Sequence, residues 1–366
     1  MQAIPVTASM SPDLEGRRRA LRLWLLAVAA LVFMTVLLGG ATRLTESGLS
    51  IVEWKPVTGS VPPLSDGAWQ AELEKYRATT QYQQLNRGMT LDQFKTIYWW
   101  EWAHRLLGRL VGAAFLVPFV WFLWRGWVER ALKWRLWGLF ALGGLQGAVG
   151  WWMVTSGLVG RVSVSQYRLA FHLTLACVIY AALVWTAQSL TTRAAIQMPR
   201  RLRVEAVALV VLVLVQIYAG ALVAGLDAGM AYNTWPRIDG AFVPSAERLW
   251  FLEPGWRNFF ENDLMVQFNH RTLAYLLCIA AVLHLMHVLE LGRTAARQGA
   301  IAVAAVMFAQ AALGVVTLLY QAPITLALMH QAMAIVLLTS AVLHAQRVSI
   351  RAPVIRLPTI HPRDRR

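Results

Sequence analysis

Charged residues are scarce in this chain of 366 residues, where Asp, Glu, Lys and Arg together make up 14%. A soluble domain of this length would carry roughly 25% charged residues. The hydrophobic residues, 57% of the chain, gather in long blocks and do not alternate with polar ones. Only helices or closed barrels satisfy the backbone in lipid, and a barrel needs that alternation. The composition therefore indicates an all-α integral membrane protein.

The apolar blocks are about as long as a bilayer is thick. The hydrocarbon core measures roughly 30 Å, which about 20 helical residues cross. We therefore predict eight transmembrane helices, at about residues 22–41, 103–124, 134–153, 167–188, 204–224, 268–289, 298–319 and 325–346. The first block is too long and begins too late for a plain signal peptide, and no small-residue cleavage site follows it.

Acidic residues are also scarce, since 19 Asp and Glu stand against 34 Lys and Arg, a net charge of +15. The basic residues precede the first predicted helix, enter the fifth, fill the loops after the second and sixth, and end the chain. All these segments lie on one side of an eight-helix topology, so the positive-inside rule places that side and both termini in the cytoplasm. Because the arginines are scattered over short loops and tails, we expect the lipid bilayer as partner and no nucleic acid.

Cysteine is almost absent. Cys177 and Cys278 both lie inside predicted helices, and the outer loops contain none. The sequence therefore offers no loop disulfide and no cysteine redox pair. We interpret both residues as small packing side chains.

The chain contains an internal repeat. Two long loops, about 42–100 and 225–265, fall on the outer side, each after the first helix of a four-helix block. Stretches of the first half recur in order in the second: "EWAHRLLGRL" with "QFNHRTLAYL", "LQGAVGWWMV" with "AQAALGVVTL", and "AFHLTLACVIYAAL" with "LMHQAMAIVLLTSA". We predict two halves, 1–197 and 198–366, each a four-helix bundle. An even number of helices per half makes the bundles parallel and pseudo-symmetric about an axis along the membrane normal.

Four histidines occupy matched places in this repeat. They are His104 and His172 in the first half, and His270 and His330 in the second. Each lies within about the first two turns of a helix that enters from outside, so all four share one depth near the outer face. Two histidines on facing helices of a bundle form an axial pair for haem iron. We predict one haem site in each half.

Small and basic residues surround these histidines. Glycines that would leave room for a flat porphyrin are Gly108, Gly112, Gly147 and Gly150. Arginines suited to holding haem propionates are Arg105, Arg109, Arg168 and Arg271. A single helical histidine is more often a packing residue than a ligand, but four at repeated positions and equal depth favour ligands. A zinc or copper site is a lesser alternative, because further Cys, His or carboxylate ligands are scarce nearby.

Three further histidines provide a contrast. His284 and His344 lie 14 residues past the histidines of the second-half pair, hence about 21 Å deeper, and His287 follows one turn later. We interpret all three as interfacial residues at the cytoplasmic helix ends, without a haem role. For His361, in the polar tail, we expect no specific role.

The two halves differ at one ionisable position. Glu101 stands three residues before His104, whereas Gln267 stands at the matching place before His270. One helical turn separates Glu101 from His104, so both face the same way. A carboxylate there can transfer protons or stabilise positive charge, and a glutamine cannot titrate near neutral pH. A simpler alternative, compatible with the first, is that Glu101 pairs with Arg105 four residues on.

These motifs resemble the haem A synthase family. The matching stretches are "EWAHR", "FNHRT", "AFHLTLA", "LMHQAMA" and the loop "RLTESGLSIVEWKPVTGSVPP", and together they span about residues 25–346. The resemblance implies an oxidoreductase that oxidises a methyl group of haem O to a formyl group by successive hydroxylations, giving haem A for cytochrome oxidase. It implies that His104 and His172 hold the substrate haem and that Glu101 is catalytic. The other half would hold a haem B cofactor on His270 and His330.

The resemblance also implies partners. A haem O synthase (protohaem farnesyltransferase) would supply the substrate, cytochrome oxidase assembly would receive the product, and an electron donor that the sequence does not identify would drive the reaction. Some family members carry a cysteine pair in the first outer loop of a half, and this chain has no such pair in either half. A thiol-based transfer of electrons or haem is therefore not expected here. We expect the long loop 42–100 to cover the substrate site. A homo-oligomer is compatible with the sequence.

Two other classes of protein stay open as alternatives. A non-catalytic bis-histidine di-haem electron carrier of the cytochrome b type would place its haems at different depths, whereas these four histidines share one. A transporter built from parallel repeats would bind its substrate at the bilayer midplane, where ionisable residues are nearly absent here. No Arg- and Ser-rich amphipathic leader extends beyond residues 1–20, so we expect a bacterial inner (plasma) membrane protein.

Overall fold

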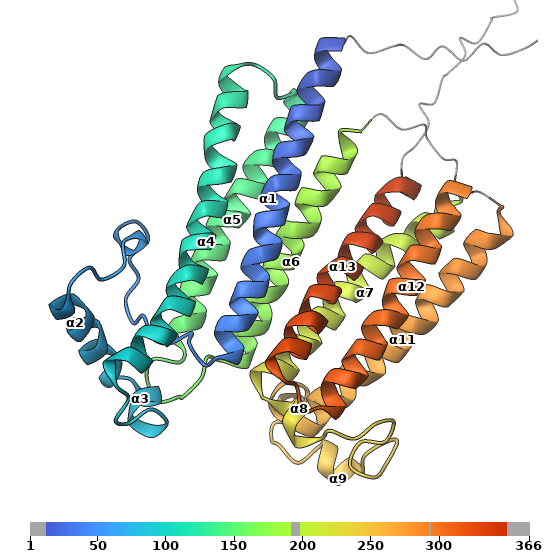
Figure 1. The fold of residues 1–366 in the computed structure, drawn as a ribbon. Helices are drawn as coiled ribbons and strands as arrows, with labels where there is room; N and C mark the ends of the chain where they lie inside the picture. The colour runs from blue at the N-terminus through green and yellow to red at the C-terminus, as the bar shows by residue number, and fades with distance from the viewer. Residues whose placement is uncertain (1–11, 192–197, 293, 350–366) are drawn as a thin grey trace, which may run out of the picture.

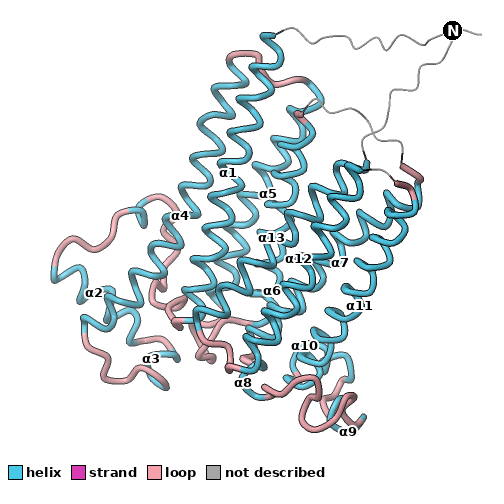
Figure 2. The backbone as a smooth tube through the Cα atoms, turned by 45° about the vertical axis from the view of Figure 1, so that its right-hand side comes forward, coloured by secondary structure: helices cyan, strands magenta, loops and turns pink. Residues whose placement is uncertain are grey.

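The computed structural model describes residues 12–191, 198–292 and 294–349, and these residues are almost entirely helical (Figure 1). No β-strand occurs among them, and one isolated bridge joins Ile238 to Ala241. Figure 2 shows the same helices as long, nearly parallel tubes with the loops gathered mainly at one end. The expectation of an all-helical fold is confirmed for the described residues.

Eight helices of 24 residues or more dominate the described chain. They are α1 (Pro12–Leu44), α4 (Leu91–Trp124), α5 (Arg130–Thr155), α6 (Gln166–Ser189), α7 (Arg200–Gly225), α11 (Asp263–Glu290), α12 (Thr294–Leu319) and α13 (Ile324–Ser349). Each contains one of the predicted apolar blocks. A helix of 24 residues is about 36 Å long, enough to cross the hydrocarbon core.

Seven of these described helices are long and apolar enough to cross a membrane, and α5 is the one that falls short. α5 begins with three basic residues in its first six, and glycines, tryptophans and Gln146 dilute the apolar residues of its remainder. The length and hydropathy of the other seven make this chain a multi-pass membrane protein.

The long helices form two groups of four. In Figure 1, α1, α4, α5 and α6 stand on the left, and α7, α11, α12 and α13 stand on the right. The groups meet where α1 and α6 pack against α7 and α13. Hydrogen bonds cross this junction, among them one between the Tyr180 and Thr339 hydroxyls (2.8 Å) and one from Gln331 Nε2 to the Val36 carbonyl (2.8 Å). The largest buried apolar cluster follows the same junction.

Short helices occupy the two long connections at one end of the bundle, opposite the start of α1 and the end of α13 (Figure 1). The first connection holds η1 (Thr58–Ser60), α2 (Asp66–Arg77) and α3 (Thr80–Gln84). The second holds α8 (Ala228–Ala231), α9 (Ala246–Leu249), η2 (Gly255–Arg257) and α10 (Asn258–Glu261).

Helix α4 begins twelve residues before the predicted span 103–124, so the predicted loop 42–100 ends at Thr90. Thr90 caps the helix through a capping box with Gln93. The first turns are too polar to read as a membrane span, but Phe94 and Tyr98 pack into a buried aromatic cluster with α2. Glu101 and His104 therefore lie well inside one continuous helix, which fixes their relative positions.

Candidate functional site

Each of the four predicted histidines rests against a glycine of a neighbouring helix. A Cβ atom added to each glycine would lie 2.7–2.9 Å from Cε1 of the histidine ring. The pairs are Gly39 with His104 (2.7 Å), Gly150 with His172 (2.9 Å), Gly220 with His270 (2.9 Å) and Gly314 with His330 (2.8 Å). Real Cβ atoms keep a longer distance, so glycine alone fits these places without a shift of the ring. The glycines lie on α1, α5, α7 and α12, the first and third long helix of each group.

The histidines form one pair in each group of helices. His104 on α4 and His172 on α6 are close enough to interact electrostatically, and so are His270 on α11 and His330 on α13. Nδ1 of His104 and Nδ1 of His330 are buried and have no hydrogen-bond partner among the described residues. The structure thus brings together the pairs that the repeat indicated.

The first pair has more open space beside it than the second. Gly108 and Gly112 lie one and two turns beyond His104 on the same face of α4, and a Cβ at either glycine would meet no atom within 4 Å. The same holds for Gly143 and Gly147 on α5. The matching residues of the second half are larger: Ala274, Cys278, Met307 and Ala311.

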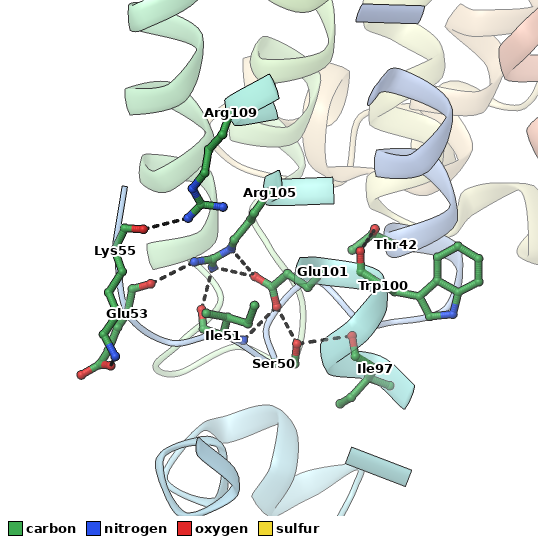
Figure 3. Close-up of polar contacts among 10 residues, drawn as sticks. All are labelled: Thr42, Ser50, Ile51, Glu53, Lys55, Ile97, Trp100, Glu101, Arg105 and Arg109. Carbon is green, nitrogen blue, oxygen red and sulfur yellow. Dashed lines mark hydrogen bonds and ion pairs between the residues drawn. The ribbon is translucent and has the colours of Figure 1, made fainter. Parts of the chain in front are cut away.

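Glu101 is 2% exposed, and both of its carboxylate oxygens accept hydrogen bonds (Figure 3). Oε2 accepts from the Ser50 hydroxyl (2.7 Å) and from the Ile51 amide (2.9 Å). Oε1 accepts from Arg105, whose Nε lies 3.1 Å away and whose Nη2 lies 2.6 Å away. The Glu101–Arg105 pair is therefore present, within a network that ties α4 to the loop after α1.

The neighbouring arginines hold that loop in place. Arg105 donates to the carbonyls of Ile51 (2.6 Å) and Glu53 (2.9 Å). Arg109, one turn further, donates to the Lys55 carbonyl (2.7 Å, Figure 3) and to the Pro56 carbonyl (2.8 Å) of the same loop. Its Nη1 is buried and has no partner among the described residues. The carbonyls of this loop therefore accept hydrogen bonds from most N–H groups of the two arginines. Nη1 of Arg109 can still bind another group.

The second half builds the same network around a neutral amide. Gln267 is 2% exposed, its Nε2 donates to the Ala228 carbonyl (2.7 Å), and its Oε1 accepts from Arg271. Arg271 also donates to carbonyls of the loop after α7.

Arg168, on α6 of the first half, donates to the Trp152 carbonyl (2.6 Å) and lies over the ring of that tryptophan. All four predicted arginines are thus bound to main-chain carbonyls.

The loop after α1 reaches across to α5. Trp54 stacks on Trp151, with ring centroids 6.1 Å apart and planes 11° apart. Hydrogen bonds and charge from Lys55 and Lys75 lower the pKa of the Glu53 carboxyl to about 2, so Glu53 is ionised at neutral pH and links the loop to α2. A pocket of about 250 Å³ lies between this loop and α4, and Arg105 and Arg109 contribute to its lining.

His284, His287 and His344 lie in one hydrogen-bonded cluster near the ends of α11 and α13, a contact that the sequence did not predict. Their place at the membrane interface stays a prediction. His284 and His344 are 2% and 3% exposed, and their Nε2 atoms lie 2.8 Å apart. Oε2 of Glu205 lies 3.0 Å from Nδ1 of His284 and 3.2 Å from Nδ1 of His287. Glu205 comes from α7, far away in sequence, and no local pattern connects it to these histidines. In the described chain no cluster of three or more His, Cys, Asp or Glu side chains is arranged to hold a metal ion.

Comparison with known proteins places this geometry in a family. Residues 22–342 match the family model COX15-CtaA, described as cytochrome oxidase assembly protein. The chain belongs to this family. The matched COX15-CtaA region contains Glu101, both histidine pairs and both long loops, so the resemblance read from the motifs is confirmed.

Curated relatives within the family are named "Heme A synthase". The protein from Rhodopseudomonas palustris strain BisA53 is 59% identical over 334 residues, which cover 91% of this chain and 92% of the relative. That from Bradyrhizobium diazoefficiens is 58% identical over 344 residues, covering 94% and 96%. That from Rhodopseudomonas palustris strain CGA009 is 61% identical over 334 residues, covering 91% and 90%. The similarity therefore extends over nearly the whole chain.

Proposed function

We propose that this chain is an oxidoreductase that converts haem O into haem A. One methyl group of the porphyrin becomes a formyl group through two successive hydroxylations, each of which requires an external oxidant that supplies the oxygen atom. They give a geminal diol that loses water. The observation that carries the proposal is the buried Glu101 one turn from His104, with an amide, Gln267, at the matching place beside the second pair. The asymmetry suits one site that performs chemistry and one that carries electrons.

All eight long helices cross the membrane in this proposal, α5 included. The two halves, 1–197 and 198–366, are parallel pseudo-symmetric bundles, with both termini in the cytoplasm of a bacterium and the histidine pairs near the outer face of its inner membrane. The four paired histidines each rest on a glycine at matched places, two in each half, which supports the pseudo-symmetry. The basic segments at the opposite end support the orientation.

Haem B is the proposed cofactor of the second half. When bound, haem B would supply one-electron transfer to the substrate haem. His270 and His330 would hold it, since the two rings are close enough to interact and each rests on a glycine of a neighbouring helix. The glycines against both rings let the helices approach closely enough to keep the two imidazoles facing each other.

Haem O would bind as the substrate between His104 and His172. Open space along the glycine faces of α4 and α5 suits a flat macrocycle that must both enter and leave. The loop that stacks Trp54 on Trp151 would close the outer end of this space and exclude water from it.

Glu101 would act as the proton acceptor or charge-stabilising group for the substrate methyl group. Four hydrogen bonds hold its carboxylate in one orientation, which is the preorganisation that such a role needs. Arg109, whose Nη1 is available, would bind a substrate propionate, and Arg105, Arg168 and Arg271 would support the propionates through the loops that they hold.

The proposed partners follow from this reaction. A haem O synthase would deliver the substrate, an electron donor would reduce the cofactor, and cytochrome oxidase assembly would use the haem A. The family description as cytochrome oxidase assembly protein supports the last of these.

Analysis of the bound haem tests the function directly. The full chain, co-expressed with a haem O synthase and purified, is extracted, and its haems are separated by chromatography and identified by mass. We expect haem B together with haem O and its oxidised products, including haem A. Haem B alone, filling both sites, would overturn the proposal in favour of the electron carrier.

A pair of glycine substitutions on α5 tests the substrate site. Gly150→Ala would place a Cβ 2.9 Å from Cε1 of His172, whereas at Gly138, about three turns away, a Cβ would meet no atom within 4 Å. Overpacking costs about 1–3 kcal/mol, so we expect Gly150→Ala to lower haem O occupancy about tenfold. Gly138→Ala should retain it. Equal haem O content in the two variants, measured per mole of protein, would contradict a ligand role for His172.

A further inference from the structure

A pocket of about 420 Å³ opens between the first turns of α7 and the last residue of α13. Both helix ends lie on the side of the bundle opposite the long connections (Figure 1). The residues that line the pocket are Arg200, Arg203, Val204, Val207, Ala208 and Ser349. None of the six is acidic, so the pocket combines positive charge with an apolar wall.

The two arginines of this pocket are unpaired. Among the described residues, neither guanidinium of Arg200 and Arg203 has a hydrogen-bond or ion-pair partner. Arg201, which stands between them, lies 2.8 Å from Oε1 of Glu205 through Nε and 3.0 Å from Nε2 of His287 through Nη2. Successive helical residues point about 100° apart. The start of α7 therefore presents a paired arginine to α11 and two unpaired arginines to the pocket.

Beyond the arginines, the outward face of α7 is apolar and uncovered. Val204, Val207, Val211 and Val215 are 42–58% exposed and follow one another at steps of three or four residues. This spacing places them in one strip, roughly 16 Å long, along the helix. Because α7 is long and apolar enough to cross a membrane, the strip faces lipid chains, and its charged end lies where the head groups begin.

This arrangement suits an anionic phospholipid. A guanidinium binds phosphate oxygens with bidentate geometry, and basic pockets between membrane helices bind anionic lipid head groups. A small soluble anion would contact the arginines and leave the apolar wall uncovered. A neutral apolar molecule would cover the wall and leave both arginines without a counter-charge. A phospholipid with net negative charge satisfies both parts of the pocket.

We propose that this pocket binds the phosphate of one anionic phospholipid, such as phosphatidylglycerol, with Arg200 and Arg203 as its ligands and the acyl chains along the valine strip. Ser349 forms the wall on the side of α13, so the bound lipid contacts both helices where they end. The inference concerns a site remote from the histidine pairs and does not rest on the proposed function.

Native mass spectrometry of the purified full chain in detergent measures this binding. Phosphatidylglycerol and phosphatidylcholine with the same acyl chains are titrated separately, and the wild type should bind the first lipid at least about tenfold more tightly. One arginine beside an anionic lipid contributes about fivefold to the affinity. Replacing Arg200 and Arg203 together by Gln should therefore weaken phosphatidylglycerol binding about thirtyfold and leave phosphatidylcholine binding unchanged.

The matched control removes the same charge elsewhere. Arg130→Gln combined with Lys133→Gln changes two exposed basic residues in the first turn of α5, at the same end of the bundle. This variant should bind phosphatidylglycerol like the wild type. An equal loss of affinity in the two double variants would show a general effect of net charge and would overturn the site.

A second pair of variants tests the pocket with both arginines in place. Ala208→Trp fills the pocket and should weaken phosphatidylglycerol binding about tenfold, whereas Ala131→Trp, at an exposed position of α5, should retain it. Circular dichroism spectra like that of the wild type verify folding.

Two further results would contradict the proposal. One is equal affinity of the wild type for the two lipids. The other is competition by glycerol 3-phosphate at the same concentration as phosphatidylglycerol, which would assign the pocket to a soluble anion.

Discussion

Replacing Glu101 by Gln is expected to stop haem A formation while both haems remain bound. The amide can neither take up a proton nor carry a charge beside the substrate methyl group. General acid–base groups contribute roughly 10²- to 10⁴-fold, and we expect a loss of haem A yield in that range. The measurement is the ratio of haem A to haem O extracted from the purified variant, made in cells that also express a haem O synthase.

The local structure sets the control for this experiment. Glu101 accepts from Ser50 and Ile51 on one oxygen and from Arg105 on the other, so an amide nitrogen must face one set of donors. Leaving buried donors unsatisfied costs about 1–3 kcal/mol, and total haem per chain therefore serves as the check on folding.

Gln267→Glu makes the reverse exchange, amide to carboxylate, at the matching place in the second half. It should retain haem A formation, since the substrate binds in the other half. Unchanged haem A yield in Glu101→Gln, with normal haem content, would remove the catalytic role and leave Glu101 as the partner of Arg105.

Replacing His270 or His330 by Ala is expected to remove the low-spin bis-histidine signal of the cofactor haem and to halve the haem-to-protein ratio. Haem A formation should stop as well, because electrons would no longer reach the substrate half. The rings rest on Gly220 and Gly314, which carry no side chain that could take their place. Electron paramagnetic resonance and optical spectra of the purified variants measure the effect.

His284→Ala is the matched control on the same helix. His284 is as buried as a ligand would be, but it contacts His344 and Glu205 and lies 14 residues from His270 along α11. Its removal should lower the free energy of unfolding by about 1–3 kcal/mol, because buried partners lose their hydrogen bonds, and should leave haem content unchanged. A normal spectrum in His270→Ala, or haem loss in His284→Ala, would contradict the assignment of the two pairs.

Some features were predictable because they depend on local composition. The length of an apolar block predicts a spanning helix, and all eight blocks became long helices in the described chain. The recurrence of "EWAHR" as "FNHRT" predicted where the histidines pair, since equal spacing along parallel helices brings equal depths. The buried pair of Glu101 and Arg105 followed from the distance of four residues.

Other features could not be predicted because their partners come from distant segments. Residues 91–100 look like loop until Phe94 and Tyr98 meet the aromatic residues of α2. Likewise, "HLMH" reads as a surface pattern until Glu205 from α7 reaches His284 and His287. The hydrogen bond from Gln216 Nε2 to the His270 carbonyl (3.0 Å) was also overlooked, although Gln-x-x-x-Gly at 216–220 recurs at 146–150 and 310–314.

By itself the sequence determined a membrane protein of long helices, a repeat with four histidines, and a single carboxylate that distinguishes the halves. Hydropathy and helical spacing are local properties. Because a spanning helix must fit the thickness of the bilayer, they also predict how deep each residue lies in the membrane. Only the tertiary structure decided which glycine lies against each histidine, because those contacts form between helices whose approach depends on packing.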